Sequence, residues 1–326
     1  MTLPTERAIE ARGAARGSFL RRTLAVGGYP AFFLGPAVVV VLLLFLVPAV
    51  LTVVISLTNL SVATGLHKYR YIGIGNYAQI THSPWLVLVL KNTMIYMLST
   101  LSLFNVGLAL MLALLTAHLS GQAPGVFRVL WMLPRITPSV IYALMWRWFA
   151  AQPPYGTLSQ ILGWAGVPGA NWMNVHPWAF IVALNGFVGA SFGMIIFSSA
   201  IAAIPHDQYL AADVDGASPW QQVWRITLPR LRWPILFVTA YQTLSLLTSF
   251  EYILLTTNGG PGFYTTEVWS LYAFHLALSN YFGNTQFGLG AALAAVLVVL
   301  GLAASAIYLR LFRFGELVAA PKIEVN

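Results

Sequence analysis

The sequence predicts an all-α integral membrane protein with six transmembrane helices. Of its 326 residues 58% are hydrophobic and only 8% are charged, and the mean hydropathy is +0.75. A soluble domain has about a quarter of its residues charged. Six apolar runs each reach the roughly 20 residues that a helix needs to cross about 30 Å of hydrocarbon. Arginine and lysine also gather in alternate connecting segments, as in multi-pass membrane proteins.

The six predicted spans follow one another with short connections. They cover residues 32–57, 93–117, 129–151, 178–204, 235–257 and 287–309. The first follows Arg21 and Arg22, but an apolar run of about 26 residues exceeds the 7 to 15 of a cleaved signal sequence, so it is expected to stay as a span. Pro138 lies inside the third span and is expected to bend it.

The distribution of basic residues orients the predicted bundle with both chain ends in the cytoplasm. Three basic residues fall on the outer side: Lys68, Arg70 and Lys91. Twelve fall in the inner segments: Arg7, Arg12, Arg16, Arg21, Arg22, Arg128, Arg225, Arg230, Arg232, Arg310, Arg313 and Lys322. This bias obeys the positive-inside rule. It accounts for most of the net charge of +8, so anionic lipid is the expected counter-ion and nucleic acid is not an expected partner.

The segment between the fourth and fifth spans is polar and is expected to lie at the cytoplasmic surface. Residues 209–214 are rich in alanine and predict a short helix. Asp215 and Gly216 form a turn pair, since glycine tolerates positive φ. Ser218 and Pro219 are suited to cap and open a second short helix that ends near Thr227. The pattern predicts a compact helix-turn-helix.

This segment resembles the coupling loop of importer permeases of the ATP-binding-cassette class, whose signature is E-A-A-x-x-D-G-A-x-x-x-x-x-F-x-x-I-x-L-P. The matching residues are Ala211, Ala212, Asp215, Gly216, Ala217, Ile226, Leu228 and Pro229. Leu210 stands where the family has glutamate, and Trp224 lies beside the usual aromatic position. The resemblance implies that Ala211, Ala212, Asp215, Gly216, Ala217 and Pro229 couple the chain to an ATPase. The alternative is an ordinary loop that lies on lipid headgroups.

Two further segments are similar to the maltose-type carbohydrate importers, whose permeases share a MetI-like transmembrane domain. They are Y-I-G-I-G-N-Y at residues 71–77, and T-T-N-G-G-P at residues 256–261 followed by Thr265, Thr266 and Glu267. The resemblance implies a basic cytoplasmic segment at 1–31, a permease domain at 32–313 with its coupling loop at 205–233, and a cytoplasmic tail at 314–326.

The same resemblance implies a function. The chain is expected to be the permease subunit of an ATP-driven importer in a bacterial cytoplasmic (inner) membrane. It would translocate a di- or oligosaccharide, a glycoside or a related polyol delivered by an extracytoplasmic sugar-binding protein. The expected partners are a second homologous permease and two ATPase subunits. An importer of glycerol 3-phosphate or glycerophosphodiesters from the same family is the main alternative.

The sequence also indicates what this chain does not do. It has no G-x-x-x-x-G-K-[ST] phosphate loop, so ATP and Mg²⁺ are expected on the partner ATPase, and no enzymatic activity is expected here. With no cysteine and no pair of histidines spaced H-x-x-x-H, no cofactor or metal ligand is assigned. An ion-coupled secondary carrier is a weaker alternative, because only Glu251 offers a carboxylate for coupling and no internal repeat is evident.

The resemblance also carries expected sugar contacts onto the fourth and fifth spans: Asn185, Gly189, Phe192, Gln242, Ser245 and Ser249. The last three are spaced by three and four residues, so they share one face of a helix. The alternative is that they only join helices by hydrogen bonds worth about 0.6 kcal/mol each.

Three charged residues lie in or near the predicted spans without an assigned role. They are Arg135 and Arg147 in the third span and Glu251 in the fifth. Charges within spans usually pair or reach toward the interface. Glu251 could instead meet a substrate hydroxyl or a cation.

Overall fold

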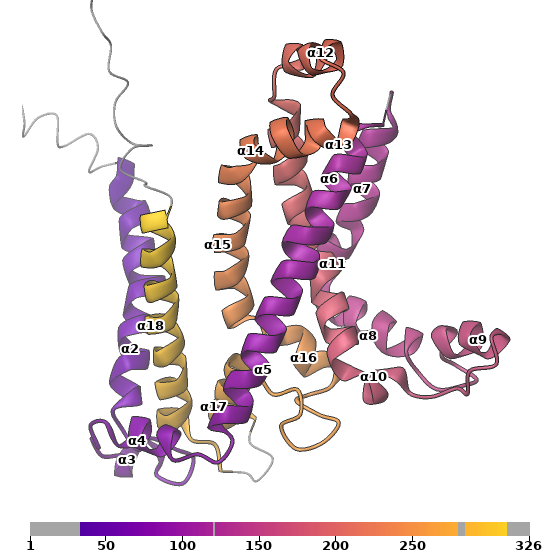
Figure 1. Ribbon diagram of the computed structural model, residues 1–326. Coiled ribbons are helices and arrows are strands. Elements are labelled where there is room, and N and C mark those ends of the chain that lie inside the picture. Colours follow the sequence, from indigo (N-terminus) through magenta and orange to yellow (C-terminus); the bar gives the residue numbers. More distant parts are fainter. Residues whose placement is uncertain (1–32, 120, 280–283, 312–326) are drawn as a thin grey trace, which may run out of the picture. The chain divides into compact units, whose positions relative to one another are not determined.

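The computed structural model describes residues 33–119, 121–279 and 284–311, and these form an all-α structure, as predicted (Figure 1). The predicted terminal segments 1–31 and 314–326 lie outside the described residues. The chain divides into two compact units, residues 1–55 and 56–326. The described part of the first unit belongs to one apolar helix, Phe33–Ser56. It contains the π-helical segment η1 (Leu42–Leu46) and α2 (Val47–Ser56), and most of its side chains are exposed.

Two long helices form the centre of the second unit. The first runs from Leu86 to Ala117 through α5 (Leu86–Ser99), the π-helical segment η2 (Thr100–Leu108) and α6 (Ala109–Ala117). The second is α11 (Pro177–Ala202), which packs along η2 and α6. Small residues at spacings of three and four allow membrane helices to approach closely, and α11 presents Gly186, Gly189 and Gly193 to its neighbour.

The predicted third span is a sharply bent pair of helices. It consists of α7 (Ala123–Ile136) and α8 (Ser139–Phe149), which meet at 96°. Thr137, with ψ of 132°, is extended at the break, because the ring of the following proline disfavours the helical conformation. The bend expected at Pro138 is confirmed.

The predicted fifth span is not one helix. It begins as α15 (Arg232–Thr248) of 17 residues, becomes extended at Ser249 with ψ of 122°, and resumes as α16 (Glu251–Thr256). Within the described part of the chain, four helices are long and apolar enough to cross a membrane, or five if the bent pair counts as one span. The predicted count of six spans is therefore not confirmed.

The remaining elements connect or cover these helices. They are α3 (Gly65–Lys68), α4 (Gly75–Thr81), α9 (Thr157–Trp164), α10 (Trp172–Val175), α12 (His206–Val214), α13 (Pro219–Gln222), the π-helical segment η3 (Val223–Thr227), α14 (Leu228–Arg230), α17 (Trp269–Leu278) and α18 (Phe287–Leu311). Figure 1 shows α12 and α13 at one end of α11, with α8, α10 and α16 at the other. The polar loop predicted to be cytoplasmic and the predicted outer loops thus lie at opposite ends of one helix.

Three apolar clusters hold the second unit together. One joins α6, α11 and α15 through Ala109, Phe197 and Val238. Another joins α5, α11 and α17 through Tyr96, Ile181 and Leu271. The third packs α17 against α18, with Trp269, Ala292 and Leu293 at its centre. α11 contributes to two of the three clusters, so the packing of this helix positions both ends of the unit.

The close approach of α11 and η2 predicts a stability difference between two glycines. A Cβ at Gly193 would lie 2.5 Å from the carbonyl oxygen of Asn105, which is backbone, whereas a Cβ at Gly301 on α18 meets only a side-chain carbon of Leu244 at 4.0 Å. We expect Gly193→Ala to destabilise the fold by about 1 to 3 kcal/mol, as overpacking does. Gly301→Ala should be neutral or stabilising, because alanine favours helix. Thermal unfolding of the purified protein in detergent measures both, and equal midpoints would contradict the packing described.

Candidate functional site

The turn after α12 is a Schellman motif. The amide of Ala217 donates to the carbonyl of Ala212 at 2.9 Å, and that of Gly216 donates to the carbonyl of Asp213 at 3.0 Å. These two bonds define the motif, which needs a residue in the left-handed region after the helix. Gly216 fills this position with φ of +72°. The short helix, turn and second helix predicted from the sequence are thus confirmed.

The second short helix is capped and tied back to the first. The Ser218 side chain accepts from the amide of Gln221, whose own side chain accepts from the amide of Ser218, and Pro219 opens the helix. This reciprocal pair is a capping box. Tyr209 and Thr227 share a hydrogen bond of 2.9 Å between their hydroxyls across the loop. The loop that links α11 to α15 is therefore fastened internally and can move as one body.

The surface of this loop is unusually apolar for a solvent-exposed turn. Leu210 is 49% exposed, Val214 89%, Trp220 68% and Trp224 56%. The rings of the two tryptophans meet edge to face, with 5.8 Å between centroids. Exposed apolar patches of this kind usually mark an interaction surface. Leu210, in the position of the family's glutamate, is part of this surface.

Two of the predicted sugar contacts join a buried polar cluster in the other half of α11. Asn185 Nδ2 donates to Ser249 Oγ at 3.2 Å and also to the Tyr96 hydroxyl. Tyr96 and Ser249 are 3.1 Å apart through their hydroxyl oxygens. The cluster links α5, α11 and the break between α15 and α16. In this structure Asn185 and Ser249 therefore hold helices together.

Two more of the predicted contacts meet each other. Gln242 is buried, and its Nε2 donates to the carbonyl of Gly189 at 2.9 Å. On its other side Gly189 faces Asn105, whose Oδ1 would lie 2.0 Å from an added Cβ. This pair joins α11 to α15 and to η2. Gln242 and Gly189 thus take part in helix packing.

The remaining two predicted contacts are accessible. Ser245 is exposed and Phe192 is partly exposed. Phe192 stacks on Tyr241 with 4.8 Å between ring centroids, and Tyr241 stacks on Phe237 at 6.5 Å. Phe237, Tyr241 and Ser245 are spaced by four residues, so they share one face of α15. We call the surface formed by Phe192, Phe237, Tyr241 and Ser245 the open face.

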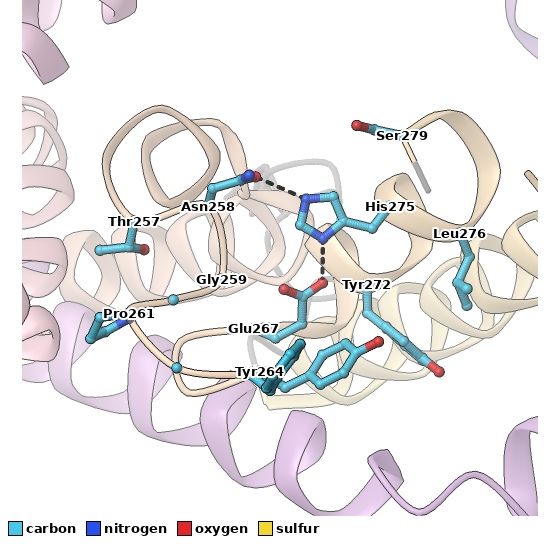
Figure 2. Close-up of a pocket in the computed structure, with 13 residues that line it drawn as sticks. Thr257, Asn258, Gly259, Pro261, Tyr264, Glu267, Tyr272, His275, Leu276 and Ser279 are labelled. Carbon is cyan, nitrogen blue, oxygen red and sulfur yellow. Dashed lines mark hydrogen bonds and ion pairs between the residues drawn. The ribbon is translucent and has the colours of Figure 1, made fainter. Parts of the chain in front are cut away.

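A pocket of about 800 Å³ lies between the outer glycine turn and α17 (Figure 2). His275 Nδ1 is 2.8 Å from Glu267 Oε1, and His275 Nε2 is 3.0 Å from Asn258 Oδ1. Figure 2 shows the imidazole held between these two side chains. A Cβ at Gly259 would lie 2.0 Å from Glu267 Oε2, and Gly259 has φ of +84°. The close contact between Gly259 and the buried Glu267 therefore requires a glycine at position 259.

Burial affects the ionisation of Glu267 in this cluster. It raises the pKa of the Glu267 carboxyl above its ordinary value, and the hydrogen bond from His275 works against that rise. The hydrogen bond between the carboxyl and the imidazole lowers the cost of burying these polar groups.

Several of these residues were not anticipated from the sequence. Tyr96 is a polar side chain within an apolar run, which is a usable signal, but its partners come from two other helices. Tyr241 lies four residues before Ser245, so helical spacing places it on the same face. The contact between Glu267 and His275 joins a loop to a helix across eight residues, and no sequence period indicates it.

The comparisons with known proteins agree with this architecture. Residues 105–314 match the model of the family described as binding-protein-dependent transport system inner membrane component. The chain is 31% identical over 86% of its length to the sulfoquinovosyl glycerol transport system permease protein of Agrobacterium fabrum, covering 89% of that protein. It is 30% identical over 86% of its length to the trehalose/maltose transport system permease protein of Thermococcus litoralis, covering 92% of that protein.

A solved structure shares the fold. It is that of a bacterial alginate ABC transporter in complex with an alginate pentasaccharide-bound periplasmic protein, with a TM-score of 0.74 and 23% identity. The match covers 90% of this chain and 97% of that one. The chain belongs to the family of inner membrane components of binding-protein-dependent transport systems.

Proposed function

We propose that this chain is one permease subunit of an ATP-driven importer that moves a sugar, as a di- or oligosaccharide, a glycoside or a related polyol. Relatives that are about 30% identical are named for the transport of sulfoquinovosyl glycerol and of trehalose and maltose. The observation that carries the proposal is the internally fastened loop between α11 and α15. These two helices also form the open face.

The loop is built to transmit motion rather than to bind substrate. Its two short helices are joined by the Schellman turn and by the hydroxyl pair of Tyr209 and Thr227. α12 follows α11 directly, and α14 leads into α15. A displacement applied to the exposed apolar surface of the loop therefore reaches both helices together. In the proposed cycle, closure of the ATPase subunits supplies this displacement.

We assign substrate contact to the open face and helix packing to the rest of the predicted set. A sugar needs hydroxyl partners and an aromatic ring face, and Ser245 with Phe192 and Tyr241 offers both. Asn185, Gly189, Gln242 and Ser249 are occupied by one another or by neighbouring helices. They set the distance between the helices that carry the accessible residues.

The same proposal gives positions for the second permease, the binding protein and the ATPase subunits. A second permease covers the open face and encloses the path, and an extracytoplasmic binding protein delivers the sugar to the end where α16 and α17 lie. Two ATPase subunits hold ATP and Mg²⁺ and dock on the coupling loop, where Ala211, Ala212, Asp215, Gly216, Ala217 and Pro229 lie. Both chain ends lie in the cytoplasm, and the membrane is the bacterial cytoplasmic membrane.

Reconstitution tests the function. The chain is purified together with its second permease and ATPase, placed in proteoliposomes and supplied with the binding protein and labelled sugar. We expect uptake that requires ATP and the binding protein. Uptake driven by a proton gradient without ATP would contradict the proposal and would favour a secondary carrier.

Substitutions of Ser245 and Ser249, which lie one helical turn apart, distinguish a residue that contacts substrate from one that packs helices together. Ser245→Leu should reduce uptake at least about tenfold while leaving thermal stability and basal ATPase activity near wild type, because the side chain projects from the exposed side of α15. Ser249→Ala should instead lower the thermal midpoint, because it removes a hydroxyl shared by Tyr96 and Asn185, a loss of about 1 kcal/mol. Uptake and melting of the assembled complex are measured for both. Unchanged uptake in Ser245→Leu would remove this residue from the path.

A matched pair of glycines tests the coupling role of the loop. Gly216 and Gly166 have φ of +72° and +78°. Each donates a 3.0 Å amide hydrogen bond, to Asp213 and Gly163 respectively. Proline at either position removes the donor and imposes negative φ. We expect Gly216→Pro to abolish transport and weaken association with the ATPase, and Gly166→Pro, at the other end of the unit, to leave that association intact. Equal association in both variants would show that the loop is not the docking element.

A further inference from the structure

An arginine stands at the edge of the open face. Arg135 lies in the last turn of α7, beside the break at Thr137, and is exposed. Its guanidinium carbon sits 5.2 Å from the centroid of the Phe192 ring. Within the described part of the chain it forms no ion pair. A charged side chain in a membrane span is costly and usually marks a path for substrate or ions.

The aromatic contact leaves the hydrogen-bonding edge of the guanidinium available. The ring face of Phe192 attracts the cation, and the same ring stacks on Tyr241 with 4.8 Å between centroids. A guanidinium has five donors in its plane and no acceptor. Its planar fork matches the paired oxygens of a carboxylate, a sulfonate or a phosphate. Among the described residues no acceptor occupies the fork, so it can bind an anion.

The carboxylate of Glu251, near Arg135, already accepts a hydrogen bond from another side chain. Glu251, in the first turn of α16, accepts a hydrogen bond from the Ser139 hydroxyl of α8. Arg135 and Glu251 both act electrostatically on Tyr252, so they belong to one neighbourhood. They nevertheless form no salt bridge among the described residues. Glu251 keeps its negative charge, but it does not occupy the guanidinium of Arg135.

We propose that the transported compound is an acidic glycoside, and that Arg135 binds its carboxylate, sulfonate or phosphate group in the translocation path. The inference rests on the proposed function and names the substrate class for that same path. A neutral sugar gains little from a cation, because its hydroxyls are read equally well by neutral groups such as Ser245. An anion gains a charge-assisted pair, about twice as strong as a neutral hydrogen bond, and offsets the cost of placing the cation there.

The first test uses neutral sugars and polyols paired with acidic derivatives. The cognate binding protein is melted in the presence of maltose or maltobionate, cellobiose or cellobionate, and glycerol or glycerol 3-phosphate. We expect stabilisation by an acidic member and not by its neutral counterpart. Stabilisation by neutral members alone would overturn the acidic assignment and leave the proposed function intact. Stabilisation by none of the six would count against both.

The second test uses the assembled complex and the acidic probe selected by the first. Arg135→Gln should lower its uptake at least tenfold. Arg135→Lys should raise the KM with little change in kcat, because it keeps the charge but loses the planar fork. Arg147→Gln is the matched control, since Arg147 is also exposed and lies in the last turn of α8. It should stay within about twofold of wild type.

Thermal stability and binding-protein-stimulated ATPase activity are measured for all three variants. Wild-type uptake of the acidic probe by Arg135→Gln would overturn the proposal and would assign the anion to the second permease. A second pattern would also overturn the proposal. In that pattern Arg135→Gln lowers the stability of the complex, and Arg135→Lys has both wild-type stability and wild-type KM. That result would make Arg135 a counter-ion to the partner subunit.

Discussion

The close contact between α11 and η2 is the constraint on which the rest of the second unit depends. Gly186, Gly189 and Gly193 bring the backbone of α11 against the side chains of Phe104, Asn105 and Ala109 and the carbonyl of Asn105. In a membrane, helices gain little from hydrophobic association, so packing and interhelical hydrogen bonds must hold them. Once the backbones are this close, Gln242 reaches the carbonyl of Gly189 and Asn185 reaches Tyr96. The position of α15, and through it of the loop that joins α11 to α15, follows from that contact.

The sequence predicted local structure well wherever a short-range rule determines it. The capped helix-turn-helix at 206–230 was expected from alanines, Asp215-Gly216 and Ser218-Pro219, because turn and cap chemistry act over a few residues. The bend at Pro138 was expected for the same reason. The break at Ser249 was not, because Ser249 is held extended by partners on α5, α11 and α17. Hydropathy alone therefore joined α15 and α16 into one span.

The candidate site shows the same division. Helical spacing placed Gln242, Ser245 and Ser249 on one stripe, yet the structure buries the first, exposes the second and engages the third at a helix break. The spacing of residues along a helix tells which of them share a face. The neighbouring helices decide which residues of that face are buried. The outer cluster of Glu267, His275 and Asn258 could not be predicted, since a loop closes around it.

The two ends of the second unit are built differently. At one end the loop between α11 and α15 is fastened by its own side chains and presents apolar area outward. At the other end the glycine turn closes on the buried pair of Glu267 and His275 beside a pocket. Between them lies the open face, where Arg135, which forms no ion pair with the described residues, lies over the ring of Phe192. In the proposed transport cycle the selectivity of this subunit depends on α7, α11 and α15, and α11 and α15 are the two helices that the loop joins. Binding of an anion by Arg135 would therefore be sensitive to the position of the coupling loop, and the same helices would both recognise the cargo and respond to the ATPase.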